Sequence, residues 1–377
     1  MQKSKKKGRR SAAAILVRVV IAAVLLCVLA AAGYILYMQM HYYRIEDHAE
    51  LDIENNASAG LKTGETYTAV TYNIGFGAYG SDYSFFMDTG EMKDGTPTKG
   101  KYGKAVSRES VESHTAGAIQ ELEGLDADFL LLQEVDVDSD RSYHVDQAQE
   151  LREAFSEYGT VFANNFHTAY LFYPFSDPHG AVQAGLLNFS RYEVEEAERR
   201  SYPVDNSFII KFTDLDRCFS VMRIPTENGR ELVLINSHMS AYDKGGLIRA
   251  QQLELLNSVM EEEYSAGNYV IVGGDFNHAL GEEVAEGFPS EQNFPAWVSV
   301  LTQDEIAEGI TMLRAKNELQ VPTCRGADIP YTKGVNYTTV VDGFLVSDNI
   351  RAAAENIDTD FAYSDHNPVR LEFELLE

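Results

Sequence analysis

Short apolar runs alternate with amphipathic stretches along most of this chain. Helical spacing of apolar residues predicts helices over Ser107–Leu125 and between Gly246 and Gly267. Several other runs are apolar almost throughout, which is typical of strands that are covered on both faces. The predicted strands are Tyr67–Tyr72, Asp128–Leu132, Gly185–Phe189, Glu231–Ile235, Tyr269–Val272, Thr338–Val346 and Val369–Leu375. Strands that alternate with helices predict an α/β fold.

The regions between these elements carry weaker signals. Residues 76–104 contain Gly, Tyr and Lys without periodicity, so we expect a long loop, which in a compact domain is usually functional or mobile. The charged runs Glu193–Arg200 and Glu261–Glu263 are interpreted as solvated faces of helices. No repeat and no second linker follows Tyr67, so the remainder is predicted to form one large domain.

The N-terminal part has a different pattern. Val19–Met38 is an uncharged run of 20 residues, long enough to span a bilayer as a helix, and a basic cluster precedes it. The positive-inside rule keeps that cluster in the cytoplasm and sends the rest of the chain across the membrane. The alternative is a signal peptide cleaved at the small residues Ala30, Ala31 and Ala32, which would give a secreted protein.

Four segments follow from this pattern. Residues 1–18 are predicted as a basic cytoplasmic segment, 19–40 as a transmembrane signal-anchor, 41–65 as a linker and 66–377 as the main domain. The formal net charge is −27, and residues 1–43 contribute seven Lys or Arg and no acid, which leaves −34 for the remainder. A domain this acidic gains nothing from the phosphate attraction behind non-specific nucleic-acid binding, so a smaller substrate is favoured over duplex DNA.

The three cysteines do not identify a compartment. Cys27 falls in the apolar run, and Cys218 and Cys324 lie beyond it. These two are compatible with one disulfide or with two buried thiols, and their spacing makes no metal motif.

Polar residues with complementary chemistry stand at the ends of six apolar strands. They are Asn73, Glu134, Asn236 with His238, Asp275 with Asn277, Asp342, and Asp365 with His366. One such residue is usually turn chemistry, but α/β enzymes build their sites where strand ends meet at one edge of a sheet. Carboxylates and amides suit a hard divalent cation, and histidine serves as acid or base near neutral pH. The set predicts metal-assisted hydrolysis of a phosphoester.

The motifs TYNIG, LLQEVD, NSHMSAYD, GGDFNH and SDHNP, in this order and spacing, resemble those of the endonuclease/exonuclease/phosphatase superfamily. That group includes secreted DNases, abasic-site endonucleases, sphingomyelinases and inositol-polyphosphate phosphatases. The resemblance covers roughly residues 66–377. It implies a four-layer α/β sandwich, with two packed mixed β-sheets flanked by helices, preceded here by one transmembrane helix.

The resemblance also implies a metal site. Glu134 would be the principal ligand, with Asn73 and Asp365 alongside. The expected ion is Mg²⁺, with Mn²⁺ or Ca²⁺ as alternatives, because hard cations prefer oxygen ligands.

Five further residues receive catalytic roles from the resemblance. His366 would contact the phosphate or act as a base, and Asp342 would orient it. Asp275 would align or deprotonate the attacking water, and Asn277 would donate to a phosphoryl oxygen. His238 would be a second histidine near the leaving group.

One segment departs from the pattern of the secreted DNases. Those enzymes place a glutamate in the segment that matches Asn165–Tyr170, where it supports the second histidine. Here the segment reads NFHTAY and contains no acid, so the full DNase mechanism is not implied.

The sequence therefore predicts a Mg²⁺-dependent phosphodiesterase or phosphatase that acts outside the cytoplasmic membrane. Its partners would be the membrane, through the N-terminal helix, and a small phosphodiester, a lipid headgroup or a nucleic acid as substrate, with no protein partner implied. An extracellular DNase is the main rival. An inactive binding module on the same fold is disfavoured, because every chemically demanding position is filled.

Overall fold

The computed structural model describes residues 4–208, 210–241 and 246–377. Lys3 of the basic cluster and Asp243 of the NSHMSAYD motif lie outside these residues, as do the side chains of residues 4–11. The chain divides into two compact units, Met1–Tyr43 and Arg44–Glu377.

The first unit is a single helix, α1 (Ser4–His41). Its segment Ala12–His41 is long and apolar enough to cross a membrane, and an 18-residue stretch within it has a mean hydropathy of 2.9. A signal sequence would meet the same description. Cys27 on this helix is a free thiol, and so are the buried Cys218 and Cys324 of the second unit. Of the two alternatives for the cysteine pair, the structure has the buried thiols.

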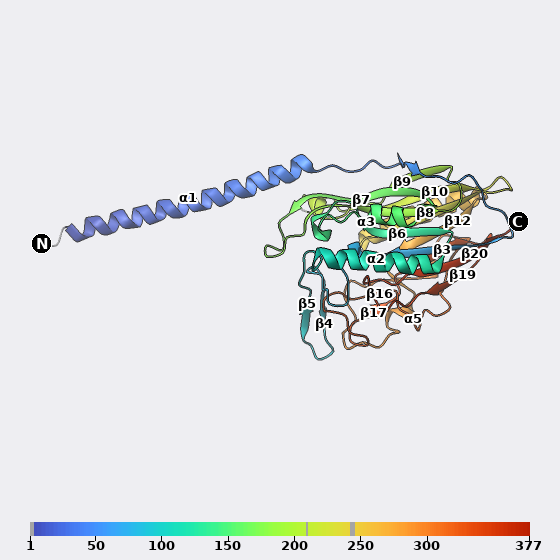
Figure 1. The fold of residues 1–377 in the computed structure, drawn as a ribbon. Coiled ribbons are helices and arrows are strands. Elements are labelled where there is room, and N and C mark those ends of the chain that lie inside the picture. The colour runs from blue at the N-terminus through green and yellow to red at the C-terminus, as the bar shows by residue number, and fades with distance from the viewer. Residues whose placement is uncertain (1–3, 209, 242–245) are drawn as a thin grey trace. The chain divides into compact units, whose positions relative to one another are not determined.

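The second unit contains two seven-stranded mixed sheets (Figure 1). The first sheet has the order β1 (Ala49–Glu50), β9 (Glu196–Ser201), β10 (Cys218–Pro225), β11 (Glu231–His238), β12 (Tyr269–Asp275), β18 (Asp342–Ser347) and β15 (Ile310–Met312). The second sheet has the order β19 (Ile350–Asn356), β20 (Val369–Leu375), β3 (Thr66–Asn73), β6 (Phe129–Asp136), β8 (Gly180–Ser190), β7 (Gly159–Leu171) and β2 (Ile53–Glu54). Both β1 and β2 lie inside the segment predicted as linker.

Short elements complete the unit. The helices are α2 (Arg108–Leu125), α3 (Gln147–Ala154), α4 (Leu247–Ser265) and α5 (Glu282–Ala285). Two-stranded pairs join β4 (Thr89–Glu91) to β5 (Pro97–Lys99), β13 (Ala279–Leu280) to β14 (Val300–Leu301), and β16 (Cys324–Arg325) to β17 (Thr338–Thr339). The first of these pairs lies in the predicted long loop.

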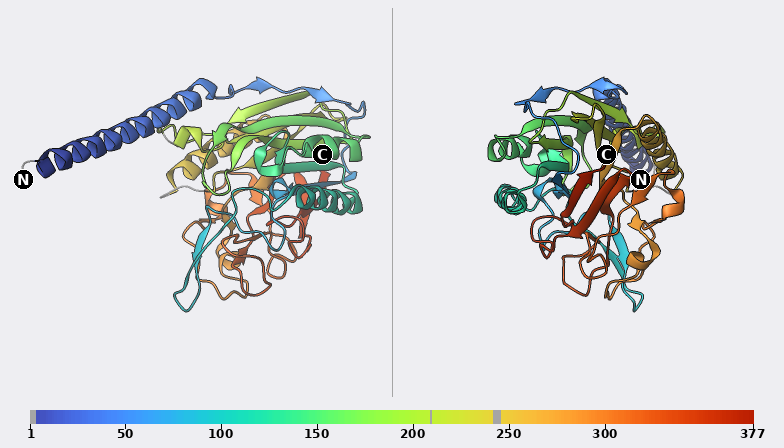
Figure 2. Two further views of the ribbon diagram at one scale, coloured as in Figure 1. Left: turned by 60° about the vertical axis from the view of Figure 1, so that its left-hand side comes forward. Right: turned by 90° about the vertical axis from the view of Figure 1, so that its right-hand side faces the viewer.

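The layers follow from the two-residue alternation of side chains along each strand. On β6, Phe129 and Leu131 face the first sheet, whereas Leu130 and Leu132 pack under α2 and α3. On β11, Leu232 and Leu234 face the second sheet, and Val233 and its neighbour Ile235 pack under α4. Figure 2, in its right-hand view, has α2 and α3 on one side of the strands and α4 on the other. The predicted four-layer sandwich is confirmed.

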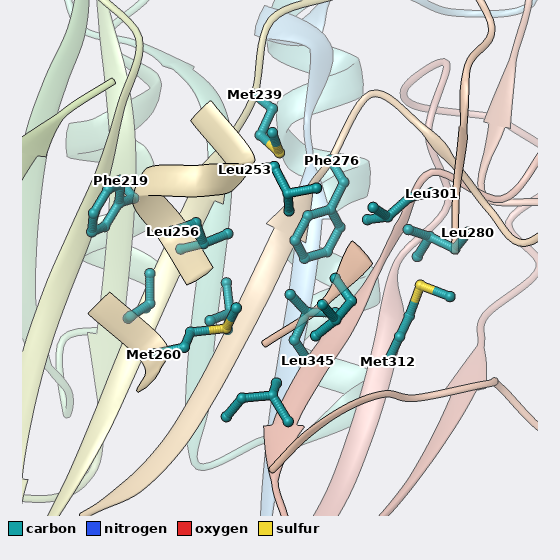
Figure 3. Packing of buried hydrophobic residues seen from close by; sticks show 14 of the residues in the cluster. Phe219, Met239, Leu253, Leu256, Met260, Phe276, Leu280, Leu301, Met312 and Leu345 are labelled. Atoms are coloured by element: carbon teal, nitrogen blue, oxygen red, sulfur yellow. The ribbon is translucent and has the colours of Figure 1, made fainter. Parts of the chain in front are cut away.

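The layer between α4 and the first sheet is a dense apolar core (Figure 3). Leu256 and Met260 of α4 pack there with Phe276 and Leu345 from the strand side, and all four are fully buried. Helical spacing on one element and alternation on the other bring these side chains to one surface, as the sequence pattern predicts.

Each predicted strand corresponds to a strand in the second unit, with one division. Thr338–Val346 is interrupted at Val340 and becomes β17 and β18. The interpretation of Glu193–Arg200 as a helix face is wrong, because this run contains most of strand β9. Ala197 and Arg199 of this strand point inward. Because one inward position is an arginine, the sequence lacks the alternation of apolar and polar residues expected of a strand.

A chain of side-chain amides ties the two sheets together between the apolar layers. The Gln133 amide donates to Asn236 Oδ1 at 2.7 Å and to Thr71 Oγ1 at 3.0 Å. Asn236 in turn donates to Asn188 Oδ1 at 2.8 Å and to the Leu132 carbonyl at 3.1 Å. All of these side chains are fully buried, so the network fixes one sheet against the other close to the strand ends.

Asn236→Ala tests this network. It removes partners from the buried amides of Gln133 and Asn188, and an unsatisfied buried polar group costs about 1–3 kcal/mol. We expect the free energy of unfolding to fall by about 2–5 kcal/mol, measured by urea unfolding of the full chain with Trp297 fluorescence. The exposed Glu123→Ala should change it by less than about 0.5 kcal/mol, and equal losses in both variants would contradict the role of the network.

Candidate active site

Three strand ends of the first sheet lie side by side. The strands β11 and β12 run parallel, with His238 opposite Asp275 at their last residues. Strand β18 runs antiparallel to β12, with its first residue Asp342 opposite Asp275. In the second sheet, β3 and β6 are parallel and Asn73 lies opposite Gln133. The sheet register alone therefore gathers a histidine, an amide and two carboxylates.

Glu134 reaches this cluster through an irregularity in β6. Pairing with β8 shifts between Leu132 and Val135, and Glu134 has a φ of 54°. A left-handed backbone is strained for a residue with a side chain, and such strain often occurs at functional sites. The bulge turns Glu134 out of the strand alternation, and its side chain is about a quarter exposed (24%) while its neighbours are buried.

The Asp275 Oδ2 atom lies at the centre of the site. Asn73 Nδ2 donates to it at 3.1 Å and also donates to Glu134 Oε1 at 3.3 Å. Nε2 of His238 lies 3.5 Å from the same Asp275 atom, and Nε2 of His366 lies 3.7 Å from it. One carboxylate oxygen thus faces groups from both sheets.

His366 forms a buried pair with Asp342. Its Nδ1 lies 2.8 Å from Asp342 Oδ2. Burial lowers the pKa of His366, but Asp342, together with Cys324 and Asp275, outweighs this effect and raises the pKa well above its ordinary value. Burial also raises the pKa of the Asp342 carboxyl to about 6, against the opposing charge of His366. His366 therefore holds the proton of the pair, and its Nε2 faces Asp275.

His238 has the opposite protonation state. Burial lowers the pKa of His238 well below its ordinary value, and the charges of Arg217, His366 and Arg141 act in the same direction. Within the described part of the chain, its Nδ1 has no hydrogen-bond partner. This agrees with the missing acid in the NFHTAY segment, and it makes His238 a neutral ring. Two histidines in one site thus differ in charge, and only His366 has a ring nitrogen hydrogen-bonded to a carboxylate.

Asp365 is placed by the hydroxyl group of its neighbour Ser364. That hydroxyl donates to the Asn73 carbonyl at 2.7 Å and accepts the His366 amide at 3.1 Å. Burial raises the pKa of the Asp365 carboxyl to about 7, against the charges of His366 and Arg325, and the Glu134 carboxylate adds to the rise. A divalent cation beside both carboxylates would relieve this cost of ionisation, so the residues fit a metal ion.

Two groups of residues compete for such an ion. Ligand atoms of Asp275, Asp342 and His366 lie within 4.8 Å of one another. However, His366 already shares its proton with Asp342. Among the described residues, no basic side chain is hydrogen-bonded to the carboxylate of Glu134 or Asp365. We favour the predicted set of Asn73, Glu134 and Asp365, in which Asn73 would turn its amide oxygen toward the ion.

Asn277 lies two residues beyond Asp275 with a φ of 50°, a conformation that asparagine tolerates. Its backbone N–H donates to Asp275 Oδ1 at 2.9 Å, and its Nδ2 donates to the Met239 carbonyl at 2.9 Å. Arg249 fixes the Asn277 carbonyl at 3.0 Å. Asn277 therefore holds the Asp275 carboxylate in place.

The structure adds one residue that the pattern does not reveal. Arg217 precedes β10 and is 5% exposed, yet its Nε and Nη1 atoms have no hydrogen-bond partner among the described residues. It lies close enough to His238 to lower the pKa of that ring. Two unpartnered nitrogens on a buried guanidinium are costly, so an anion is the group that would satisfy them. An arginine before a strand gives no signal in the sequence. Asn236, by contrast, belongs to the network between the sheets and not to this cluster.

Comparisons with known proteins identify a family and a fold. The family model described as "Endonuclease/Exonuclease/phosphatase family" matches residues 70–366. A search of curated proteins finds no match.

Solved structures match the fold at low identity. The endonuclease/exonuclease/phosphatase from Beutenbergia cavernae is 16% identical with a TM-score of 0.52, covering 82% of this chain and 72% of that chain. TDP2 from Caenorhabditis elegans is 14% identical with a TM-score of 0.51, covering 83% of this chain and 76% of that chain. A truncated form of the latter is 15% identical with a TM-score of 0.50, covering 83% of this chain and 98% of that chain. Similarity at this level shows the fold alone.

Metal binding can be separated from activity. Mg²⁺ added to the EDTA-treated full chain should raise the melting temperature, because an ion bound only by the native state stabilises it by about 2.7 kcal/mol at 100 times its dissociation constant. Glu134→Gln and Asp365→Asn should abolish this shift, and Asp342→Asn should retain it. A shift that survives Glu134→Gln and disappears in Asp342→Asn would assign the ion to the other group.

Proposed function

The chain belongs to the endonuclease/exonuclease/phosphatase family, and from this we propose that it is a divalent-metal-dependent phosphoester hydrolase. The observation that carries the proposal is the convergence of Asn73, His238 and His366 on Asp275 Oδ2, with Glu134 beside them. An inactive binding module is disfavoured, because it would have no reason to keep a protonated and a neutral histidine around one carboxylate.

Glu134 and Asp365 would hold the cation, with Asn73 as a third ligand. A bound divalent cation would neutralise the charge of the phosphate and polarise its oxygens. Mg²⁺ is the ion we propose, because the candidate ligands are all oxygens and it keeps several of its waters.

The reaction would be in-line attack of water on phosphorus. The water oxygen forms a bond to phosphorus while the bond from phosphorus to the leaving oxygen breaks. Asp275 would take the proton of the attacking water, with its carboxylate held by Asn73 and by the Asn277 amide. The leaving oxygen then takes a proton from solvent.

Charge on the phosphoryl oxygens would be stabilised by three groups. The protonated His366, oriented by Asp342, would donate from Nε2. Asn277 would donate its side-chain amide after leaving the Met239 carbonyl. Neutral His238 can donate a hydrogen bond near the leaving group but is a poor proton source, because burial keeps its pKa low.

Arg217 would anchor a phosphate oxygen beside His238. Its two unpartnered nitrogens offer donors in a buried setting, where a charge-assisted bond is stronger than in water. The acidic charge of the domain favours a small phosphodiester or a lipid headgroup over duplex DNA, and a nuclease remains the main alternative. We further propose that α1 anchors the domain outside the cytoplasmic membrane.

His366→Ala and Asp275→Asn test the catalytic assignment. Each should lower the rate of bis-p-nitrophenyl phosphate hydrolysis by about 10³-fold, close to 4 kcal/mol of barrier, and EDTA should abolish it. The matched control Glu123→Ala should keep the full rate. Full activity of either site variant, or a rate that EDTA does not change, would refute the proposal.

Arg217→Met distinguishes a phosphate anchor from a structural arginine. Removing a charged hydrogen bond of about 1.5–3 kcal/mol should lower kcat/KM by about 10- to 100-fold. The melting temperature should stay unchanged or rise, because the variant no longer buries an unpartnered charge. If stability and kcat/KM both fall, the arginine is structural.

A further inference from the structure

The linker enters the second unit at the edge that carries the candidate active site. Asp216 accepts from Arg44 Nη1 at 2.8 Å and from the Ile45 amide at 2.8 Å, and Asp47 accepts the Ser201 amide at 2.7 Å. Ser201 ends β9 and pairs with Cys218, the first residue of β10. The next residue of β10, Phe219, pairs with Ser237, which directly precedes His238. Both ends of the connection between β9 and β10 therefore lie beside the catalytic strand ends.

A short stretch of chain joins α1 to the second unit. The helix ends at His41, and Arg44 is bound to Asp216, which directly precedes Arg217. Three residues of extended chain span at most about 10 Å. Arg44 therefore lies within that reach of the last residue of α1.

Large apolar side chains are exposed on two connections at this edge. In the connection between β7 and β8, Phe172 is 51%, Tyr173 is 54% and Phe175 is 86% exposed. This connection ends at β8, whose Ala184 pairs with Asp136 two residues after Glu134. In the connection between β9 and β10, Phe208 is 57% and Ile210 is 40% exposed. We name these five residues the aromatic rim.

The aromatic rim is continuous with the interior of the site. Ring contacts run from Tyr79 to Phe85 at 6.0 Å, from Phe85 to Phe86 at 4.8 Å, and from Phe86 to Tyr173 at 5.5 Å. Burial raises the pKa of Tyr79 well above its ordinary value, and the Asp365 carboxylate adds to this effect. A row of tilted and edge-to-face ring contacts thus leads from Tyr79, near Asp365, to Tyr173 of the aromatic rim.

We propose that the aromatic rim inserts into the outer surface of the bilayer that holds α1, so that the active site faces the membrane. The inference rests on the proposed function and anchoring, and it narrows the substrate class to phosphoesters presented at a lipid surface. Aromatic side chains favour the membrane–water interface. The second unit, Arg44–Glu377, has a net charge of −34 and would repel anionic lipid and nucleic acid, which makes a zwitterionic lipid the occupant.

Site-directed spin labelling of the full chain in phosphatidylcholine nanodiscs tests the proposal. Cys27→Ala removes the exposed thiol, and the two buried thiols stay. Labels are then placed with Phe175→Cys, Phe208→Cys and, as a control, Glu123→Cys at the opposite end of the sheets. We expect oxygen to relax the labels at 175 and 208 more strongly than a polar nickel chelate does, and the reverse at 123. Equal, water-like accessibility at all three positions would overturn the proposal.

Two readouts separate this inference from the proposed function. Each labelled chain should hydrolyse soluble bis-p-nitrophenyl phosphate at the rate of the unlabelled chain, since the rim lies outside the catalytic cluster. Labels buried in the bilayer on a chain that does not hydrolyse the substrate would refute the proposed function and leave the insertion of the aromatic rim in place. Active chains whose labels are exposed to water would refute the insertion of the aromatic rim and leave the proposed function in place.

Discussion

Crowding of negative charge at one edge of the sandwich governs the organisation of this molecule. Glu134, Asp275, Asp342 and Asp365 meet where two sheets end, and the side chains of Asp275 and Asp342 are buried. Taking like charges out of water is costly, and a different interaction compensates this cost for each carboxyl group. Asp342 shares the proton of His366, Asp275 accepts from Asn73 and the Asn277 amide, and the remaining pair fits a cation. The interaction that stabilises each carboxyl group also gives that group its proposed catalytic role.

The same constraint explains features of the scaffold. The left-handed backbone at the Glu134 bulge is strained, and the register of the strands around it holds that strain. The amide network from Gln133 to Asn188 fixes the sheets just behind the site, so that groups from both sheets can share Asp275. A purely apolar interface would leave more freedom between the sheets, because apolar contacts carry little directional information.

Much of this could be predicted from the sequence, and the remainder has physical reasons. Apolar strands that end in polar residues pointed to the eight candidate residues and also to Asn236, because chemistry concentrated at strand ends is local in the chain. The roles of the eight residues stay predictions, and Asn236 belongs to the amide network. The four-layer arrangement came only from the motif resemblance, since alternation does not say which sheet a strand joins. Strand β9 was misread because Arg199 points inward and bonds to backbone carbonyls. Arg217 was missed because its role depends on burial beside His238, which no local pattern encodes.

A crystal structure of the full chain with Mn²⁺, measured at the manganese absorption edge, tests the central claim most directly. The account predicts one strong anomalous peak about 2.0–2.3 Å from carboxylate oxygens of Glu134 and Asp365, with the His366–Asp342 pair intact. A peak between Asp342 and His366, or no peak at this edge of the sheets, would contradict it.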